Sequence, residues 1–230
     1  MFQKITADFI RDAFALLRHL RPGKWEYGVE VPISEFSQYA HLGLTSRLKN
    51  LVSGVKRKDR QLGVMLEEAL GAEYIIKPDI VIGRWPVSDE EINQHAAVLS
   101  SEAPIAVLMP FRERNHPGKK YMVLHASISC KWTMRSDRAQ NTRTEALTLI
   151  RYRKGPLPHI LAVTAEPLPS RISSLALGTG DLDCVYHFAL PELKQAVEEL
   201  GNADQLEILQ SLIEGHRLRD ISDLPFDLAI

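Results

Sequence analysis

The stretch from residue 121 to residue 153 constrains the fold of this chain more than any other. Every second residue from 122 to 130 is apolar, and the alternate positions include His125, Ser129 and Lys131. This two-residue period is typical of a half-buried β-strand, whose side chains point alternately to its two faces. The pattern therefore predicts a strand that presents Ser129 and Lys131, and also His125, on the same polar face.

A helix is predicted directly after this strand. Asp137 is a suitable N-cap with Gln140 as its third-position partner, and apolar or small residues recur at helical spacing as far as Ile150. Glu145 lies about two turns along this helix. A lysine at a strand end and an acid on the next helix, together with an aspartate on a neighbouring strand, can hold a divalent metal ion against a phosphodiester.

Strands and helices alternate along the rest of the chain without an internal repeat, a low-complexity tract or an evident linker. Helices are predicted at residues 2–20, 34–51, 59–70, 88–99 and 204–215 and from Pro191, and strands at residues 25–31, 74–82, 159–165 and 184–189. A length of 230 residues is sufficient for one domain with a substantial core. This order therefore predicts a single α/β domain over residues 1–230, with helices on both sides of a mixed sheet.

Composition excludes some classes of protein. Hydrophobic residues make up 45% of the chain and charged residues 25%, as in an ordinary soluble globular protein. The chain has no apolar run long enough to cross a membrane and no signal-peptide pattern, so we expect a cytoplasmic location and no membrane partner. Cys130 and Cys184 lack the spacing of a zinc or redox motif, and we expect a buried structural role for both.

The net charge is −1, but its distribution along the chain is uneven. Between positions 131 and 154 there are seven basic residues and two acidic ones, which favours contact with a phosphate backbone. A second basic run at residues 56–60 is more typical of solvated surface.

Asp79 has two interpretations, a turn residue at a strand end or a metal ligand, and the second depends on the presence of Lys131 and Glu145.

Several sequence blocks identify a family. In chain order they are RPGKW, QYAHL, KPDIV, HASISCKWTMRSDRAQN, TAEPLPSRISS, GTGDLDCVYHFAL and DISDLPFDLAI. Together they resemble the type II restriction endonucleases of the NgoMIV family. In this family the nuclease signature reads S-x-K followed by an acid in the next helix, whereas the more familiar D/E-x-K signature has its acid just before the lysine. Ser129 and Lys131 match the S-x-K, and Glu145 matches the displaced acid.

The resemblance implies a restriction-endonuclease-like fold and magnesium-dependent hydrolysis of DNA to 5′-phosphate and 3′-hydroxyl ends. Asp79 would be the central metal ligand, the backbone carbonyl of Cys130 would add an oxygen, and Glu145 would complete the site, with two Mg²⁺ ions expected. Lys131 would orient or help to deprotonate the attacking water, and Ser129 would contact water or metal. Taken alone, Lys131 would be interpreted as a lysine at a strand end that extends its charged group to solvent. Glu145 alone would be interpreted as a solvated acid on a helix surface or as part of a salt bridge.

An arginine-rich turn precedes the predicted helix and is suited to reading bases. Arginine can hold guanine with two hydrogen bonds and aspartate can accept one from cytosine, so Arg135, Asp137 and Arg138 suit G·C pairs in the major groove. By resemblance, these three residues would read a central CCGG, and Arg171 would read an outer G·C pair to give the palindrome GCCGGC. Without the family, the same turn would be interpreted as a surface that contacts phosphates.

The expected partners follow from the palindrome and from the family. Cutting both strands of double-stranded DNA calls for at least a homodimer, and the resemblance suggests a homotetramer and a cognate cytosine methyltransferase in a bacterial host. Family members carry a longer N-terminal region, with an outer-base contact and an acid near the metal site, and Gln3 stands where that acid is expected. An alternative function is therefore a sequence-specific DNA-binding remnant without cleavage. A repair nuclease or junction resolvase is a third.

Overall fold

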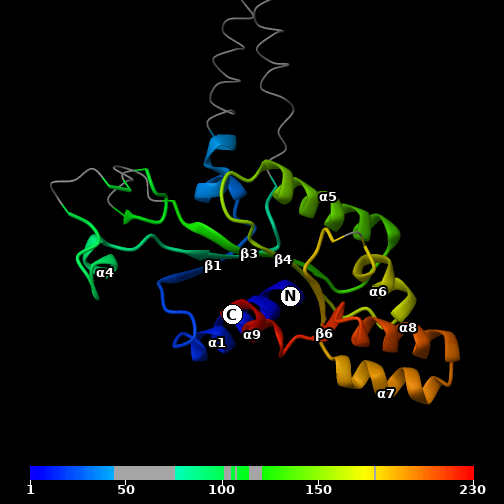
Figure 1. Ribbon diagram of the computed structural model, residues 1–230. Helices are drawn as coiled ribbons and strands as arrows, with labels where there is room; N and C mark the ends of the chain where they lie inside the picture. Colours follow the sequence, from blue (N-terminus) through cyan, green and yellow to red (C-terminus); the bar gives the residue numbers. More distant parts are fainter. Residues whose placement is uncertain (44–75, 101–104, 107, 114–120, 179) are drawn as a thin grey trace, which may run out of the picture.

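The computed structural model describes residues 1–43, 76–100, 105–106, 108–113, 121–178 and 180–230. In this part of the chain six strands form one sheet, in which the order in space follows the order in the sequence (Figure 1). The strands are β1 (Trp25–Val29), β2 (Ile80–Arg84), β3 (Val123–Lys131), β4 (His159–Thr164), β5 (Cys184–His187) and β6 (Leu218–Asp220). Neighbours from β1 to β3 are antiparallel, and neighbours from β3 to β6 are parallel. The predicted mixed sheet of an α/β protein is confirmed.

Helices cover both faces of the sheet, as predicted (Figure 1). One face packs against α1 (Phe2–Leu16) and α9 (Leu224–Ala229), in a core that includes Phe14 and Ile128. The other face packs against α5 (Ser136–Tyr152), α6 (Pro169–Ala176), α7 (Leu190–Leu200) and α8 (Ala203–Glu214). The shorter helices are α4 (Asp89–Ile92), η1 (Ile33–Glu35) and η2 (Ser37–Tyr39). No helix in the described ranges has the length and apolar character needed to cross a membrane.

Strand β3 is buried on both faces, whereas its sequence pattern predicts a half-buried strand. Ser127 is 5% exposed and Ser129 is 8% exposed. The polar face is closed because α5 lies over it, and the Ser129 Oγ atom lies 3.3 Å from Thr142 Oγ1 of that helix. The prediction of a half-buried strand is therefore wrong, because small hydroxyl side chains fit beneath a helix when they find a hydrogen-bond partner there.

A β-bulge interrupts the alternation of side chains in β3. The register of β3 against β2 shifts opposite Gly83, which leaves His125 without a partner in the ladder. The Nε2 atom of His125 lies 2.9 Å from the carbonyl oxygen of Leu228 in α9, whereas Ser129 contacts α5 on the other face. The prediction that His125 shares a face with Lys131 is therefore wrong, because the extra residue puts the two parts of the strand out of phase.

The side chain of Asn93 ends α4 earlier than the sequence predicts. Ser88 caps this helix as predicted, and its hydroxyl accepts a hydrogen bond from the N–H of Glu91. The helix stops at residue 92 rather than at residue 99, because Oδ1 of Asn93 accepts hydrogen bonds from the N–H groups of Val98 and Leu99.

Other predicted boundaries also differ from those observed. α1 ends at Leu16 rather than at residue 20, and β2 begins at Ile80, after Pro78, which has no N–H to donate to a ladder. Residues 33–39 form two 3-10 turns, and α-helix begins only at residue 40 instead of at residue 34. The predicted helix at residues 59–70, with the basic run near it, lies outside the described residues.

Candidate functional site

Asp79 and Lys131 form an ion pair at the end of β3. Asp79 directly precedes β2, and the antiparallel pairing of β2 with β3 brings it beside the last residues of β3. The Lys131 Nζ atom donates a hydrogen bond of 2.7 Å to Asp79 Oδ2, and the backbone N–H of Cys130 donates one of 2.8 Å to the same oxygen. The Asp79 side chain is 27% exposed and the Lys131 side chain 21% exposed. Sheet pairing therefore fixes this carboxylate at a place that solvent reaches.

Helix α5 brings Glu145 to the same region. The helix packs on β3 through Thr142, whose Oγ1 atom lies 3.3 Å from Ser129 Oγ. Glu145 comes one turn after Thr142 and so lies on the same side of the helix. Burial raises the pKa of the Glu145 carboxyl, the charge of Lys131 lowers it, and the charge of Asp79 raises it. The structure thus brings together the four residues predicted to be catalytic.

Several oxygen atoms at this site have no partner in the part of the protein that the structure describes. Within the described residues, neither Asp79 Oδ1 nor the Glu145 carboxylate takes part in a hydrogen bond or an ion pair. A half-buried carboxylate without a donor is unfavourable until a cation or a proton neutralises it. Such oxygen atoms suit Mg²⁺, which binds one or two carboxylates and keeps several water ligands. The residues therefore fit an open magnesium site, and the described ranges contain no group of three or more His, Cys, Asp or Glu that could enclose a metal ion.

Cys130 and Gln3 lie next to the site and add no charge to it. Burial is the main cause that raises the pKa of the Cys130 thiol to about 12, so the thiol stays protonated and only the backbone of this residue is available as a ligand. The free cysteine Cys184 is buried, as expected for a structural role, whereas Cys130 is only partly buried. The Nε2 atom of Gln3 donates a hydrogen bond to the backbone carbonyl of Asp79. The start of α1 therefore reaches the site.

The sequence-based reasoning missed Trp132, which directly follows Lys131. Its side chain is 59% exposed. Its ring meets that of Phe2 in α1 edge to face, with centroids 5.2 Å apart, and Phe2 meets Phe188 in the same way at 5.5 Å. A bulky aromatic residue immediately after the S-x-K motif is the signal that could have identified it. An exposed aromatic ring beside the site is available for contact with a ligand.

A second group of predicted residues surrounds a cavity at the starts of α5 and α6. Arg135 is the N-cap residue of α5, and Arg171 lies in the first turn of α6. Both line a cavity of about 370 Å³, together with Met134, Ser170 and Ser174. Arg135 is exposed, and the Arg171 side chain is 54% exposed. The two arginines therefore border one accessible space although they come from different helices.

Asp137 and Arg138 lie in the first turn of α5, and the structure describes their backbone but not their side chains. The helix begins at Ser136, and its N-cap residue Arg135 makes no side-chain cap hydrogen bond. The prediction that Asp137 caps the helix is therefore wrong, because the helix starts before this residue. The segment 135–138 enters α5 only a few residues after the end of β3.

Glu166 is another residue that the sequence-based reasoning missed. It is 0% exposed, and it accepts a hydrogen bond of 2.6 Å from the backbone N–H of Met134, the residue before Arg135. An acid placed between a buried strand and two prolines, as in TAEPLP, was the available signal. A fully buried acid is rare unless it is paired or hydrogen-bonded, so its presence here indicates a specific role.

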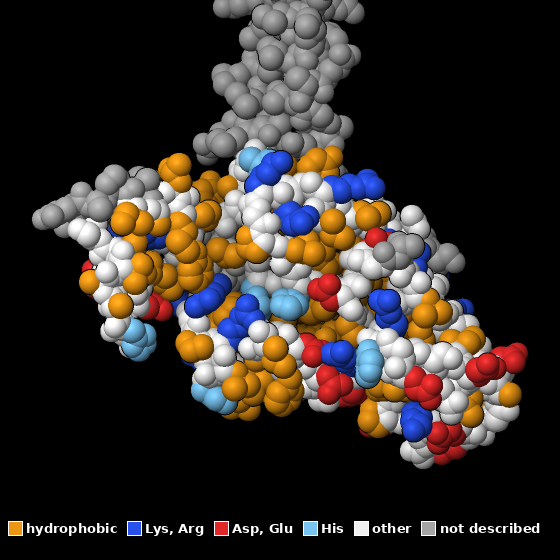
Figure 2. Space-filling view, viewed as in Figure 1, with side chains coloured by type: hydrophobic (Ala, Val, Ile, Leu, Met, Phe, Trp, Pro, Cys, Tyr) orange, Lys and Arg blue, Asp and Glu red, His pale blue; other side chains and the backbone are white. Residues whose placement is uncertain are grey.

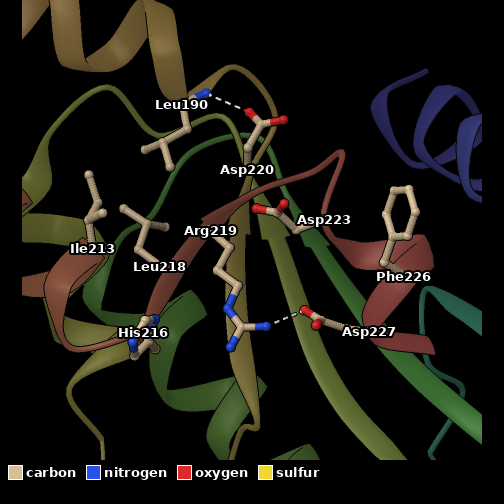
Figure 3. A pocket seen from close by; sticks show the side chains of 9 residues that line it. All are labelled: Leu190, Ile213, His216, Leu218, Arg219, Asp220, Asp223, Phe226 and Asp227. Carbon is tan, nitrogen blue, oxygen red and sulfur yellow. Dashed lines mark hydrogen bonds and ion pairs between the residues drawn. The ribbon is translucent and has the colours of Figure 1, made fainter. Parts of the chain in front are cut away.

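A larger cavity, of about 440 Å³, lies apart from these residues at β6 (Figure 3). Three of its polar side chains, those of Arg219, Asp220 and Asp227, have protein partners. Asp220 accepts a hydrogen bond of 3.0 Å from the N–H of Leu190, and Asp227 forms an ion pair with Arg219 at 2.5 Å (Figure 3). These contacts hold the elements around β6 together, so we assign this cavity to structure rather than to chemistry.

Charge is distributed unevenly over the surface. Acidic side chains gather over α7 and α8, at the lower right of the face shown in Figure 2. The exposed acids of these two helices are Glu192, Glu198, Glu199, Asp204, Glu207 and Glu214. A chain with a net charge of −1 can therefore retain a basic region elsewhere, at the segment that enters and follows α5.

Fold and site together define a class of protein. A mixed sheet with an aspartate before one strand, a lysine at the end of the next and a glutamate on the following helix is the arrangement of a restriction-endonuclease-like hydrolase. A family model described as NgoMIV restriction enzyme matches residues 1–230. The chain is also 45% identical, over 234 residues, to the type II restriction enzyme NgoMIV of Neisseria gonorrhoeae, an alignment that covers 100% of this chain and 76% of that protein. The chain belongs to the NgoMIV restriction enzyme family, so the predicted family and the enzyme class, a type II site-specific endonuclease, are confirmed.

Proposed function

We propose that residues 1–230 form a single nuclease domain that cuts double-stranded DNA at the palindrome GCCGGC, around its central CCGG, with magnesium as cofactor. A water oxygen would bond to phosphorus while the bond to the 3′ oxygen breaks, which leaves 5′-phosphate and 3′-hydroxyl ends. Family membership supports the class of reaction. The contact of Lys131 Nζ with Asp79 Oδ2, beside a Glu145 carboxylate that has no hydrogen-bond partner among the described residues, is the observation that carries the proposal.

Each residue of the site has a proposed role in this reaction. Asp79 and Glu145 would hold Mg²⁺, two ions in the complete site, and the backbone carbonyl of Cys130 would be a further oxygen ligand. Bound magnesium lowers the pKa of a coordinated water and offsets charge in the transition state. Lys131 orients the attacking water or helps to remove its proton, and its charged form offsets the charge of the phosphate. The Ser129 hydroxyl, held from the side of α5, provides a polar contact for water.

The proposed base readout uses Arg135, Asp137 and Arg138 for the central CCGG and Arg171 for the outer G·C pair. A guanidinium group can hold guanine O6 and N7 with two hydrogen bonds, and a carboxylate can accept one from cytosine N4. The cavity shared by Arg135 and Arg171 supports this readout, because both side chains are accessible from one space between the starts of two helices.

The proposed assembly follows from the palindrome. Two active sites related by a two-fold axis are needed to cut both strands, so a homodimer is the minimum, and a pair of dimers would form a tetramer. A cognate cytosine methyltransferase would protect the host DNA, and both enzymes would act in the bacterial cytoplasm. Light scattering of the free protein and of its DNA complex tests the assembly. A monomer under both conditions would contradict the dimer, and a stable dimer would remove only the tetramer.

A cleavage assay tests the proposed activity. DNA with one GCCGGC site is incubated with Mg²⁺, with Ca²⁺ or with EDTA, and we expect cleavage only with Mg²⁺, at that site, with ends that a ligase can rejoin. DNA copies in which one central or one outer base pair is changed should not be cleaved. Site-specific binding without cleavage at any Mg²⁺ concentration would favour the alternative, a DNA-binding protein that does not cut. Cleavage that ignores sequence would reject the proposed base readout.

A further inference from the structure

A buried carboxylate lies between the two segments that carry the proposed base-reading arginines. Glu166 follows β4, and its side chain is 0% exposed. Its backbone N–H donates a hydrogen bond of 3.1 Å to Thr164 Oγ1, and its carbonyl oxygen lies 3.2 Å from His187 Nε2 on β5. These contacts anchor the backbone of Glu166 to the sheet.

Each carboxylate oxygen of Glu166 accepts a hydrogen bond from a different segment. Oε2 accepts one of 2.6 Å from the N–H of Met134, just before α5, and Oε1 accepts one of 3.2 Å from the N–H of Leu168, the N-cap residue of α6. The Met134 side chain is itself buried, at 1% exposure. Hydrogen bonds to an ionised acceptor are stronger than those to a neutral one. One carboxylate therefore ties the starts of α5 and α6 to each other.

The same carboxylate also faces Arg171. The Nη1 atom of Arg171 lies 3.7 Å from Glu166 Oε1, while the Arg171 side chain remains 54% exposed. Arg135 immediately follows Met134, and both arginines line the cavity of about 370 Å³. Glu166 thus contacts the backbone beside one arginine and the side chain of the other, although it is itself inaccessible from the surface.

We propose that Glu166 is a positioning residue for base recognition, which sets the spacing and orientation of the Arg135 and Arg171 segments on DNA. This inference rests on the proposed readout by these arginines. Two hydrogen bonds to one guanine require the planar guanidinium group to align with the edge of the base. A shift of either helix start weakens this contact without removing any group that touches DNA. Loss of Glu166 should relax discrimination at central and outer pairs together, whereas loss of Arg171 should relax it at the outer pair alone.

Competition binding tests the inference, with Ca²⁺ in place of Mg²⁺ to suppress cutting. GCCGGC DNA competes with copies changed at one central or one outer pair. The variant is Glu166→Gln, whose amide group can accept only through one oxygen, and the matched control is Asp220→Asn. Asp220 accepts hydrogen bonds of 3.0 Å from the N–H groups of Leu190, at the start of α7, and of Ser222. It therefore makes the same kind of contact, but it does not line the cavity of Arg135 and Arg171. We expect E166Q to lose roughly tenfold in discrimination at both positions, and the control to keep the wild-type ratios.

The outcomes separate a positioning role from a general structural one. Partial unfolding lowers binding to every sequence equally, so it does not change a ratio of affinities. An E166Q protein with wild-type ratios, or with a loss confined to the outer pair, would overturn the inference. A wild-type protein that does not discriminate at all would reject the base readout itself, which is a different failure.

Amide hydrogen exchange on the wild-type protein provides a test that does not depend on a folded variant. The N–H groups of Met134 and Leu168 should exchange slowly, because each is bonded to a buried carboxylate. Exchange at these two positions as fast as in an exposed loop would overturn the positioning role, whatever the behaviour of E166Q.

Discussion

Glu145 and Glu166 belong to neighbouring regions of the molecule, the proposed catalytic site and the proposed base-reading segments, and their surroundings differ. The Glu145 carboxylate is half-buried and has no hydrogen-bond donor within the described residues. The Glu166 carboxylate is fully buried and accepts two backbone hydrogen bonds. An acid with open acceptors is suited to bind a cation, whereas an acid with filled acceptors is suited to hold the backbone in place. The same type of side chain is thus suited to bind a metal ion in one region and to hold the backbone in the other.

The largest effect is expected from Asp79→Ala, which should break the catalytic region only. Removal of this proposed metal ligand should lower the cleavage rate by roughly 10³-fold or more, because the attacking water depends on bound magnesium. Binding to GCCGGC DNA should change little, because Asp79 contacts neither arginine-bearing segment. Single-turnover cleavage and filter binding measure the two effects. Cleavage at a rate comparable to wild type would exclude Asp79 from the metal site.

Arg135→Ala and Arg171→Ala should break the recognition region and divide it into two parts. Each arginine that holds a guanine with two hydrogen bonds should contribute about 1–3 kcal/mol of discrimination at its own base pair. Arg135→Ala should lower discrimination at the central CCGG, and Arg171→Ala should lower it at the outer pair. Binding competition at several salt concentrations measures both. An equal loss on all sequences, with a flatter salt dependence, would show that the arginine contacts phosphate instead.

Glu166→Gln and Glu145→Gln should shift the stability of the metal-free protein in opposite directions. E166Q should lower the free energy of unfolding by about 1–3 kcal/mol, because a buried backbone N–H loses its acceptor. E145Q should raise the free energy of unfolding at neutral pH, because the ionised Glu145 carboxylate opposes folding. The gain should be less than about 1 kcal/mol, because solvent partly screens this half-exposed group.

The pH dependence gives the sign of the Glu145 effect. Its pKa is raised in the folded protein, chiefly by burial, so the favourable contribution of its protonated form is present at low pH and is lost as the pH rises through the folded pKa. The advantage of E145Q over wild type should therefore be largest above that pKa and shrink below it. Urea unfolding of both proteins in EDTA, at pH values below and above the folded pKa, measures the difference in free energy of unfolding. A stability advantage of E145Q that grew toward low pH would contradict burial as the cause.

Local patterns in the sequence were sufficient to predict β3 and α5. The two-residue period of the strand and the helical spacing after it depend only on neighbouring residues, and both elements were predicted within a few residues of their observed bounds. The phase of His125 could not be predicted in this way, because the bulge depends on how β3 pairs with β2. The early end of α4 has a similar cause, a side-chain contact that Asn93 makes with residues beyond the helix.

In the candidate site, too, some residues could be predicted from the sequence and others could not. Lys131 and Glu145 lie in one contiguous block of sequence, and the family resemblance pointed to both of them and to Asp79. Glu166 and Thr142 were not predicted, because their partners come from other segments of the chain, and only the folded structure places them in contact. Motifs therefore identify the residues proposed to act on the substrate, whereas the residues proposed to position them are visible only from three-dimensional contacts.

The bulge at His125 has a consequence for changes in the length of the chain. Because this residue is unpaired in the ladder, its deletion would leave a regular strand in which Ser129 and Lys131 keep their present face. The same deletion within β4, where the pairing with β3 is continuous, would turn every later side chain of that strand to the opposite face. The strand that carries Lys131 thus contains one residue more than its pairing with β2 requires, and the orientation of the lysine does not depend on that residue.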